Sequence, residues 1–177
     1  MLCLLLLLVT THLFAKRYVI LVSIDGLRPE FYTDSTWGAT TLQHMMRNGT
    51  SAKGVISVYP SSTFPAHATM LTGVSPARHG VYYNEVFDEG TESGKWYWYD
   101  SSIKSPTLWQ VAAKAGLTTA AVSWPVAAGA AVNYNIPHIW STDRKIKEVD
   151  MIRKSSVPAG FLEEIEKNVT GTFNYRS

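Results

Sequence analysis

The sequence predicts an α/β fold, with a doubly wound, mostly parallel sheet and helices on both of its faces. Two observations predict it. The first is a run of apolar, largely β-branched residues over 18–24, which has the character of a strand buried on both faces. The second is that amphipathic segments bounded by proline or glycine alternate with the predicted strands. Such an alternation is typical of parallel sheets.

The predicted elements follow one another along the chain. The first strand ends at Asp25-Gly26, and a helical face of Leu42, Met45 and Met46 comes after it. The later predictions are a strand over 54–58, a short helix from Pro65 to Leu71, a helix from Ser105 to Ala115, a strand over 118–124, and a final helix containing Phe161, Leu162 and Ile165. The segment 82–105 is rich in aromatic and polar residues, which predicts a long loop or an insertion.

The composition is that of one globular domain. Of 177 residues, 46% are hydrophobic, 17% are charged and 12% are aromatic, which excludes the polar signature of disorder. A formal net charge of +2 is too small to indicate a nucleic-acid-binding patch or an affinity for acidic membranes. The sequence does not predict an oligomeric state.

The N-terminal segment is rich in leucine. Met1–Phe14 is too short to span a bilayer, which takes about 20 apolar residues, and it suits the apolar region of a secretory signal. We therefore predict a signal peptide over 1–15, with Ala15 last before cleavage, and a secreted, periplasmic or extracellular product without a further membrane span. The absence of basic residues before the leucines and the size of Leu13 weaken this prediction. A buried strand or a short anchor is the alternative. The only cysteine, Cys3, lies in this segment, so the mature chain has no disulfide framework.

Asp25 follows the first predicted strand directly. Ligands of open α/β sheets bind beyond the carboxyl ends of the strands, and a carboxylate at that edge can hold a metal ion. Gly26 allows the chain to turn there. An ordinary Asp-Gly turn is the simpler interpretation of this pair taken alone.

A second candidate is the segment 59–67, which leaves the predicted strand 54–58 and enters a helix at Pro65. A hydroxyl at this junction faces the helix N-terminus, where free N–H groups and the helix dipole favour phosphate. The local pattern by itself favours a purely structural N-cap at Ser62 or Thr63.

The third candidate is Asn84, whose amide can donate to a phosphate oxygen; taken singly, it suits a turn. His67 is predicted to be a surface or helix-packing residue without chemistry. A strand-end Asp, a hydroxyl at a helix N-terminus and a downstream Asn are together the groups needed to attack phosphorus. Because a free hydroxyl is a poor nucleophile, such a site needs a metal to stabilise the alkoxide.

The motifs together resemble the nucleotide pyrophosphatase/phosphodiesterase family, within the alkaline phosphatase superfamily. The segments that carry the resemblance, in order, are 19–29, 59–65, 71–80, 84–88 and Ser123-Trp124-Pro125. The resemblance implies an alkaline-phosphatase-like sheet. It also implies that residues 16–177 are the N-terminal part of a type I phosphodiesterase/nucleotide pyrophosphatase catalytic domain acting on small nucleotide-type substrates.

The resemblance further implies two zinc ions as cofactors. Asp25 and Thr63 match ligands of one zinc, and Thr63 matches the nucleophile that forms a covalent phospho-threonine before water hydrolyses it. Asn84 matches the residue that, with the backbone N–H after the nucleophile, holds the phosphoryl oxygens. Phe64 or Tyr82 would stack on the base of the substrate, although packing in the core is an equally good interpretation.

The sequence departs from the family pattern after Trp124. The later Asp and His motifs that complete the zinc sites do not occur, and His138 and Asp143 lack their spacing. We therefore expect a truncated chain, inactive by itself and weak in zinc binding. The alternatives are another phosphohydrolase of the superfamily or a catalytically silent fragment or binding protein. Two glycosylation patterns, at 48–50 and 168–170, are uninformative as sequence alone.

Overall fold

The structure is a computed structural model that describes residues 17–89 and 91–173. The predicted signal peptide over 1–15 therefore lies outside the described residues. The chain divides into two compact units, Met1–Ser51 and Ala52–Ser177. No helix in the described ranges has both the length and the apolar character that crossing a membrane requires.

The first unit is helical where it has regular structure. Its elements are α1 (Glu30–Thr33), the 3-10 helix η1 (Ser35–Trp37) and α2 (Thr40–Asn48). The Asp34 carboxylate accepts the Thr36 N–H at 2.8 Å and so caps η1. The helix predicted around Leu42 is confirmed as α2, in which Leu42 and Met46 are half-buried and Met45 is exposed.

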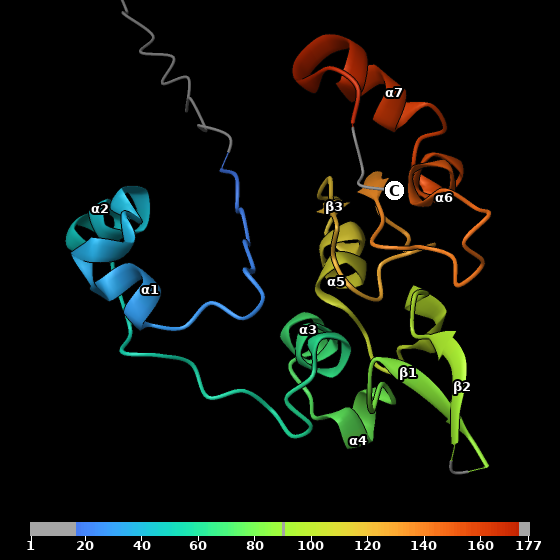
Figure 1. Ribbon diagram of the computed structural model, residues 1–177, viewed down its shortest axis with the longest axis horizontal. Coiled ribbons are helices and arrows are strands. Elements are labelled where there is room, and N and C mark those ends of the chain that lie inside the picture. Colours follow the sequence, from blue (N-terminus) through green and yellow to red (C-terminus); the bar gives the residue numbers. More distant parts are fainter. Residues whose placement is uncertain (1–16, 90, 174–177) are drawn as a thin grey trace, which may run out of the picture. The chain divides into compact units, whose positions relative to one another are not determined.

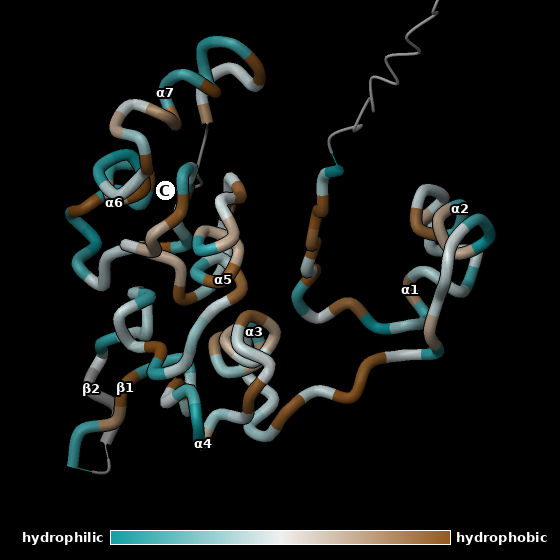
Figure 2. Tube along the Cα trace, turned by 180° about the vertical axis from the view of Figure 1, so that it is seen from behind, coloured by the Kyte–Doolittle hydropathy of each residue, from teal (hydrophilic) through white to brown (hydrophobic). Residues whose placement is uncertain are grey.

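Residues 18–24 are extended but do not form the predicted strand. The large apolar side chains of this run are exposed, with exposed fractions between 51% and 95%. Figure 2 shows the run as a hydrophobic stretch of an extended segment. The predicted strand over 54–58 is also absent, and Val55 and Ile56 are 93% and 99% exposed. Both strand predictions are therefore wrong for this structure, and so is the predicted burial of the run 18–24. The physical reason is that a strand is completed by hydrogen bonds to a neighbouring strand, which the sequence of one segment does not supply.

The second unit holds most of the regular structure (Figure 1). Its elements are α3 (Thr63–Thr72), α4 (Pro76–His79), β1 (Glu85–Asp88), β2 (Thr91–Trp96), η2 (Asp100–Ser102), α5 (Leu108–Lys114), β3 (Ala120–Val122), β4 (Tyr134–Ile136), α6 (Glu148–Ser155), α7 (Phe161–Ile165) and the π-helical turn η3 (Glu166–Thr170).

The strands form two small sheets among the described residues. β1 and β2 pair antiparallel, with Glu85 opposite Trp96, and β3 and β4 pair parallel, with Val122 opposite Ile136. The mixture of helices and strands is confirmed. One doubly wound sheet is not seen in the described part of the chain. The hairpin β1–β2 also corrects the prediction of a long loop over 82–105, because β-forming residues on both sides of the turn at Glu89 pair as strands.

The helix predicted from Ser105 to Ala115 is confirmed as α5, and Trp109 is its buried residue. Thr107 and Gln110 form a capping box at its start, with Thr107 N–H donating to Gln110 Oε1 at 3.1 Å. Leu108 and Val111 are 54% and 57% exposed, whereas Trp109 is 7% exposed and its Nε1–H donates to Asp100 Oδ1 at 3.0 Å. The larger indole therefore decides which face packs.

Two clusters of buried side chains form the core of the second unit. One joins α3 to the chain after β2 and to the C-terminal helices; its largest members include Phe64, Trp98, Ile139, Ile152 and Leu162. The other joins α3 to α5 and β3 and includes Leu71, Trp109, Ala121 and Val132. Because α3 contributes to both clusters, its position is fixed from two sides.

Candidate functional site

Thr63 is the first residue of α3. Ser62, immediately before it, is extended (φ −102°, ψ 160°) and its side chain makes no capping hydrogen bond. The interpretation of Ser62 as a side-chain N-cap is therefore not supported. Thr63 itself is half-buried and lies where the helix exposes its first N–H groups.

The cap of α3 comes from Asn84, twenty residues later. Asn84 Oδ1 accepts the Phe64 N–H at 3.0 Å, so a side chain outside the helix satisfies one of its free donors. The Asn84 carbonyl accepts the Tyr97 N–H at 3.1 Å, and Asn84 directly precedes β1. The base of the hairpin thus holds Asn84 at the N-terminus of α3. The structure brings together the residue after the predicted nucleophile and the predicted amide donor.

His67 lies one helical turn after Thr63 in α3. Its Nδ1 lies 2.7 Å from the Thr63 carbonyl oxygen, and His67 is 6% exposed. Of the two predicted positions for His67, packing within the helix fits the structure and the surface position does not. The Trp124 ring meets the His67 ring edge to face at 5.2 Å.

Trp124 lies in a strained segment just after β3. Ser123 and Val126 have φ values of 47° and 64°, which are unfavourable for residues other than glycine and most of all for a β-branched one. The Trp124 Nε1–H is buried and has no hydrogen-bond partner in the described part of the chain. Trp124 belongs to the motif Ser123-Trp124-Pro125, but neither backbone strain nor an unsatisfied buried donor can be predicted from that motif.

His79 connects the end of α4 to the same helix. Its Nδ1 accepts the Val81 N–H at 3.2 Å, which leaves Nε2 as the protonated nitrogen, 3.0 Å from Thr69 Oγ1. The imidazole is fully buried, and this burial lowers the pKa of His79 below its usual value, partly opposed by the Pro65 carbonyl. His79 is thus a neutral structural histidine that ties the α4 end to α3.

The two aromatic candidates differ in access. Phe64 is 1% exposed, and its ring packs edge to face on Trp96 and Trp98 at centroid distances of 5.5 and 5.6 Å. Of the two interpretations left open by the sequence, core packing fits this position. Tyr82 is 49% exposed and lies two residues before Asn84. Burial raises the pKa of the Tyr97 phenol, and nearby Tyr82 adds to the shift.

Asp25 lies in the first unit, in the turn after the extended run. Gly26 adopts φ 68°, as the sequence predicts for a glycine after a carboxylate that ends a segment, and Leu27 N–H donates to the Ile24 carbonyl at 3.3 Å. Over residues 17–89 and 91–173, no group of three or more His, Cys, Asp or Glu side chains is arranged to hold a metal ion. Tetrahedral zinc takes four ligands. The described residues therefore do not fit a complete zinc site.

Comparison with known proteins matches residues 19–174 to the family described as type I phosphodiesterase / nucleotide pyrophosphatase. Ectonucleotide pyrophosphatase/phosphodiesterase family member 3 of Rattus norvegicus is 30% identical over 138 residues, which cover 72% of this chain and 15% of the relative. Family member 1 of Homo sapiens is 31% identical over 117 residues, covering 60% of this chain and 12% of the relative.

A venom phosphodiesterase of Macrovipera lebetinus is 28% identical over 145 residues, covering 75% of this chain and 16% of the relative. The chain therefore spans less than a fifth of the length of these three relatives.

Proposed function

We propose a function from one premise: the chain belongs to the type I phosphodiesterase / nucleotide pyrophosphatase family. Thr63 would be the nucleophile of a hydrolase that cleaves phosphodiester or pyrophosphate bonds in nucleotide-type substrates. One observation carries the proposal most directly: the hydrogen bond from Phe64 N–H to Asn84 Oδ1. This bond joins the residue after Thr63 to the Asn84 amide at the N-terminus of a ten-residue helix. The same amide would hold the phosphoryl group that Thr63 attacks.

The reaction would proceed in two in-line displacements. Thr63 Oγ1 gives its proton to solvent and bonds to phosphorus while the bond from phosphorus to the leaving oxygen breaks. This gives a covalent phospho-threonine adduct and releases the leaving group as an oxyanion. A water oxygen then bonds to phosphorus and loses a proton, the Oγ1–phosphorus bond breaks, and the departing Thr63 oxygen takes up a proton to restore the hydroxyl. The chain's own groups contribute by position, since α3 is fixed by two core clusters.

Asn84 would have two roles in this scheme. In the structure its carboxamide oxygen caps Phe64 N–H, so its NH2 group is the part left to donate elsewhere. During the reaction this NH2 group and the Phe64 N–H would donate to the phosphoryl oxygens, where charge develops. Binding of a phosphoryl oxygen to Phe64 N–H would displace the Asn84 oxygen from it.

Zinc would enter as a cofactor that this chain holds only in part. When bound, two zinc ions would stabilise the threonine alkoxide and the leaving oxygen, and Asp25 and Thr63 would be ligands of one of them. We propose that the 177-residue chain alone binds zinc weakly and is inactive, because the later Asp and His motifs of the family do not occur in its sequence. The remaining ligands would come from outside it.

The exposed Tyr82 is the better candidate for stacking on a substrate base. Its ring is accessible near Asn84, whereas the buried Phe64 ring already packs on two indoles. Stacking on an accessible ring is tolerant of base identity. The proposal therefore assigns Tyr82 to the base and Phe64 to the core.

We further propose that residues 16–177 are the N-terminal part of the catalytic domain and that the parallel pair β3–β4 belongs to a larger, doubly wound sheet. Export through the segment 1–15 agrees with the names of the relatives, an ectonucleotide pyrophosphatase and a venom phosphodiesterase among them. The product would then act outside the cell or in an equivalent compartment.

The test compares the 177-residue chain with any longer product of the same transcript, using the chromogenic diester thymidine 5′-monophosphate p-nitrophenyl ester and added zinc. We expect hydrolysis by the longer product only. In it, Thr63→Ala should reduce kcat/KM by about 10³-fold or more. Trapping by acid quench should place the thymidine 5′-phosphoryl group, with the nucleoside still attached, on Thr63 by mass spectrometry. Activity that survives Thr63→Ala, or a label on another residue, would overturn the proposal.

Asn84→Asp is the matched variant for the second residue. It keeps an oxygen that accepts the Phe64 N–H but removes the amide donor, so helix stability should remain near that of the parent. The rate should fall by about 10²-fold, the usual cost of losing one donor to a developing oxyanion. Parent-like kcat in Asn84→Asp would limit Asn84 to capping α3.

A further inference from the structure

We infer that Asn168 is an acceptor of an N-linked glycan. The pattern Asn-x-Ser/Thr, with x other than proline, occurs at 48–50 and at 168–170. Sequence alone does not distinguish the two. The structure does, because the two asparagines have different surroundings.

Asn168 lies on η3, a turn without a single buried residue. The Asn168 side chain is exposed, and the neighbouring Val169 is 79% exposed. Within the described ranges the Asn168 carboxamide makes no hydrogen bond. Its Nδ2 is therefore accessible, and substitution of this nitrogen breaks no side-chain hydrogen bond among the described residues.

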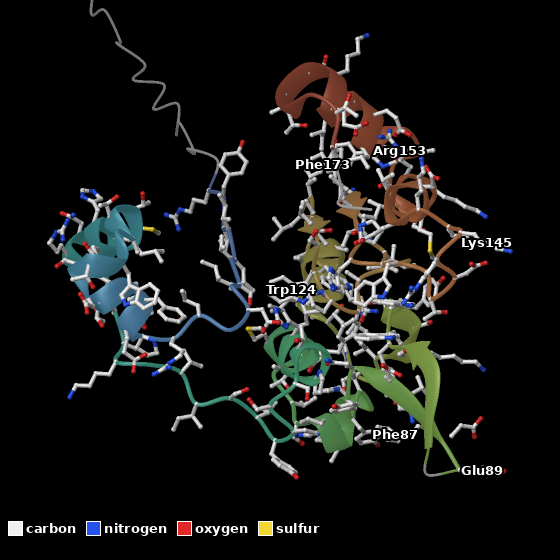
Figure 3. The ribbon with its side chains drawn as sticks, viewed as in Figure 1. Phe87, Glu89, Trp124, Lys145, Arg153 and Phe173 are labelled. Atoms are coloured by element: carbon white, nitrogen blue, oxygen red, sulfur yellow. The ribbon has the colours of Figure 1, made fainter. Side chains whose placement is uncertain are left out.

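The segment around Asn168 is held at its base. The Glu166 carboxylate accepts the Phe173 N–H at 2.8 Å and pairs with the Arg153 guanidinium at 2.7 Å, so the segment 167–172, which begins within the π-helical turn η3, is closed at its base. Figure 3 labels Arg153 and Phe173. Residues 167–172 are all exposed, so opening this segment uncovers no buried side chain of its own, and such segments open at low free energy. The pattern 168–170 can thus unwind into a transferase site while the core stays folded.

Asn48 is the matched contrast. It is the last residue of α2, and its Nδ2 already donates to the His44 carbonyl at 2.9 Å. Modification there would compete with a hydrogen bond at the helix C-terminus, where carbonyl groups lack helical partners. We therefore expect Asn168 to be the modified site of the two.

The modification is an ordinary glycosyl transfer. Asn168 Nδ2 bonds to the anomeric carbon of an oligosaccharide carried on a polyprenyl pyrophosphate. The bond from that carbon to the pyrophosphate oxygen breaks, the carrier leaves as pyrophosphate, and the carboxamide loses one proton. A glycan at this point would lie beside Val169 and Phe173, which are 79% and 42% exposed, and would shield them from other molecules.

This inference rests on the proposed export of the chain, so the experiment separates the two. The complete 177-residue chain is translated with microsomes twice, once as it is and once behind a secretory leader of proven function. Resistance to added protease reports import, and a gel shift reversed by an endoglycosidase reports the glycan. Failure of the native chain to be imported would contradict export alone, because the leader-fused chain still tests the glycan.

The imported, leader-fused chain should show a single reversible shift. Asn168→Gln and Thr170→Ala should each abolish it, Thr170→Ser should retain it as the conservative control, and Asn48→Gln should leave it unchanged. An imported chain without the shift, or a shift that survives Asn168→Gln, would overturn the inference.

Discussion

The extended run 18–24 and helix α3 are both rich in apolar residues, yet their surroundings are opposite. The run's side chains, apart from Ser23, are between 51% and 95% exposed, whereas Phe64, Ala68 and Leu71 of α3 are between 0% and 4% exposed. A helix closes its own backbone hydrogen bonds and then needs only an apolar surface to pack on. A strand needs a second strand before its apolar side chains can be buried.

The same difference separates the candidate site residues. Thr63 and Asn84 are placed by α3 and by the base of a hairpin, both of which are complete within the second unit. Asp25 follows the extended run in the first unit, and no group of three metal-binding side chains forms in the described residues. A site assembled from strand ends thus depends on the sheet, while a site at a helix N-terminus depends on one helix and its cap.

The largest expected effect on stability comes from removing a buried side chain of α3. Phe64→Ala should lower the free energy of unfolding of the second unit by about 3–5 kcal/mol, because it empties a site surrounded by indoles. Ile56→Ala, in the exposed segment of the same unit, should change it by less than about 0.5 kcal/mol. Urea denaturation followed by tryptophan fluorescence measures both.

Phe64→Leu keeps the measurement informative if Phe64→Ala does not fold. Phe64→Leu should lower the free energy of unfolding by an amount between those of Ile56→Ala and Phe64→Ala, since leucine fills part of the volume of the phenyl ring. Equal effects at positions 56 and 64 would show that the exposed segment packs in solution, and the contrast drawn above would then be wrong.

A smaller effect tests whether helices of the second unit are stabilised locally. Thr107→Ala removes the hydroxyl that caps α5 and should destabilise the unit by about 1 kcal/mol. Thr107→Ser keeps the hydroxyl and loses only the methyl group, so the difference between the two variants isolates the cap. If the two variants are equally stable, the capping box contributes nothing to stability.

The smallest expected effect is a pH dependence from His79. Burial lowers its pKa in the folded state, so below about pH 6.5, the ordinary value for histidine, the unfolded state binds more protons. The stability due to this group is present at pH 7 and declines as the pH falls through that range. Unfolding free energies measured between pH 5 and pH 8 should therefore rise with pH.

His79→Gln provides the reference for that slope. The glutamine does not titrate, so the difference between parent and variant removes the contribution of other groups. The parent should lose stability relative to His79→Gln as the pH falls below 6.5. A constant difference across the range would mean that His79 is protonated equally in both states.

Part of the site could be predicted from sequence because it is local. The junction at Thr63 carries a proline two residues later and a glycine after the last turn, and α3 indeed runs from Thr63 to Thr72 with Gly73 at its end. The role of Asn84 as the cap was not predictable, since it depends on a contact across twenty residues. The hairpin was predictable in principle from β-forming residues around Glu89, but the aromatic composition of 82–105 favoured a loop.

By itself, the sequence determined the family, the helices α2, α3, α5 and α7, and the turn at Asp25-Gly26. These depend on motifs and on neighbours a few positions away. Only the tertiary structure decided which apolar residues are buried. It placed Trp109 rather than Leu108 in the core, turned Phe64 inward, and joined Asn84 to the helix that begins at Thr63. The physical reason is that burial and hydrogen bonding between distant segments depend on which surfaces meet, and a periodic pattern specifies a face without specifying its partner.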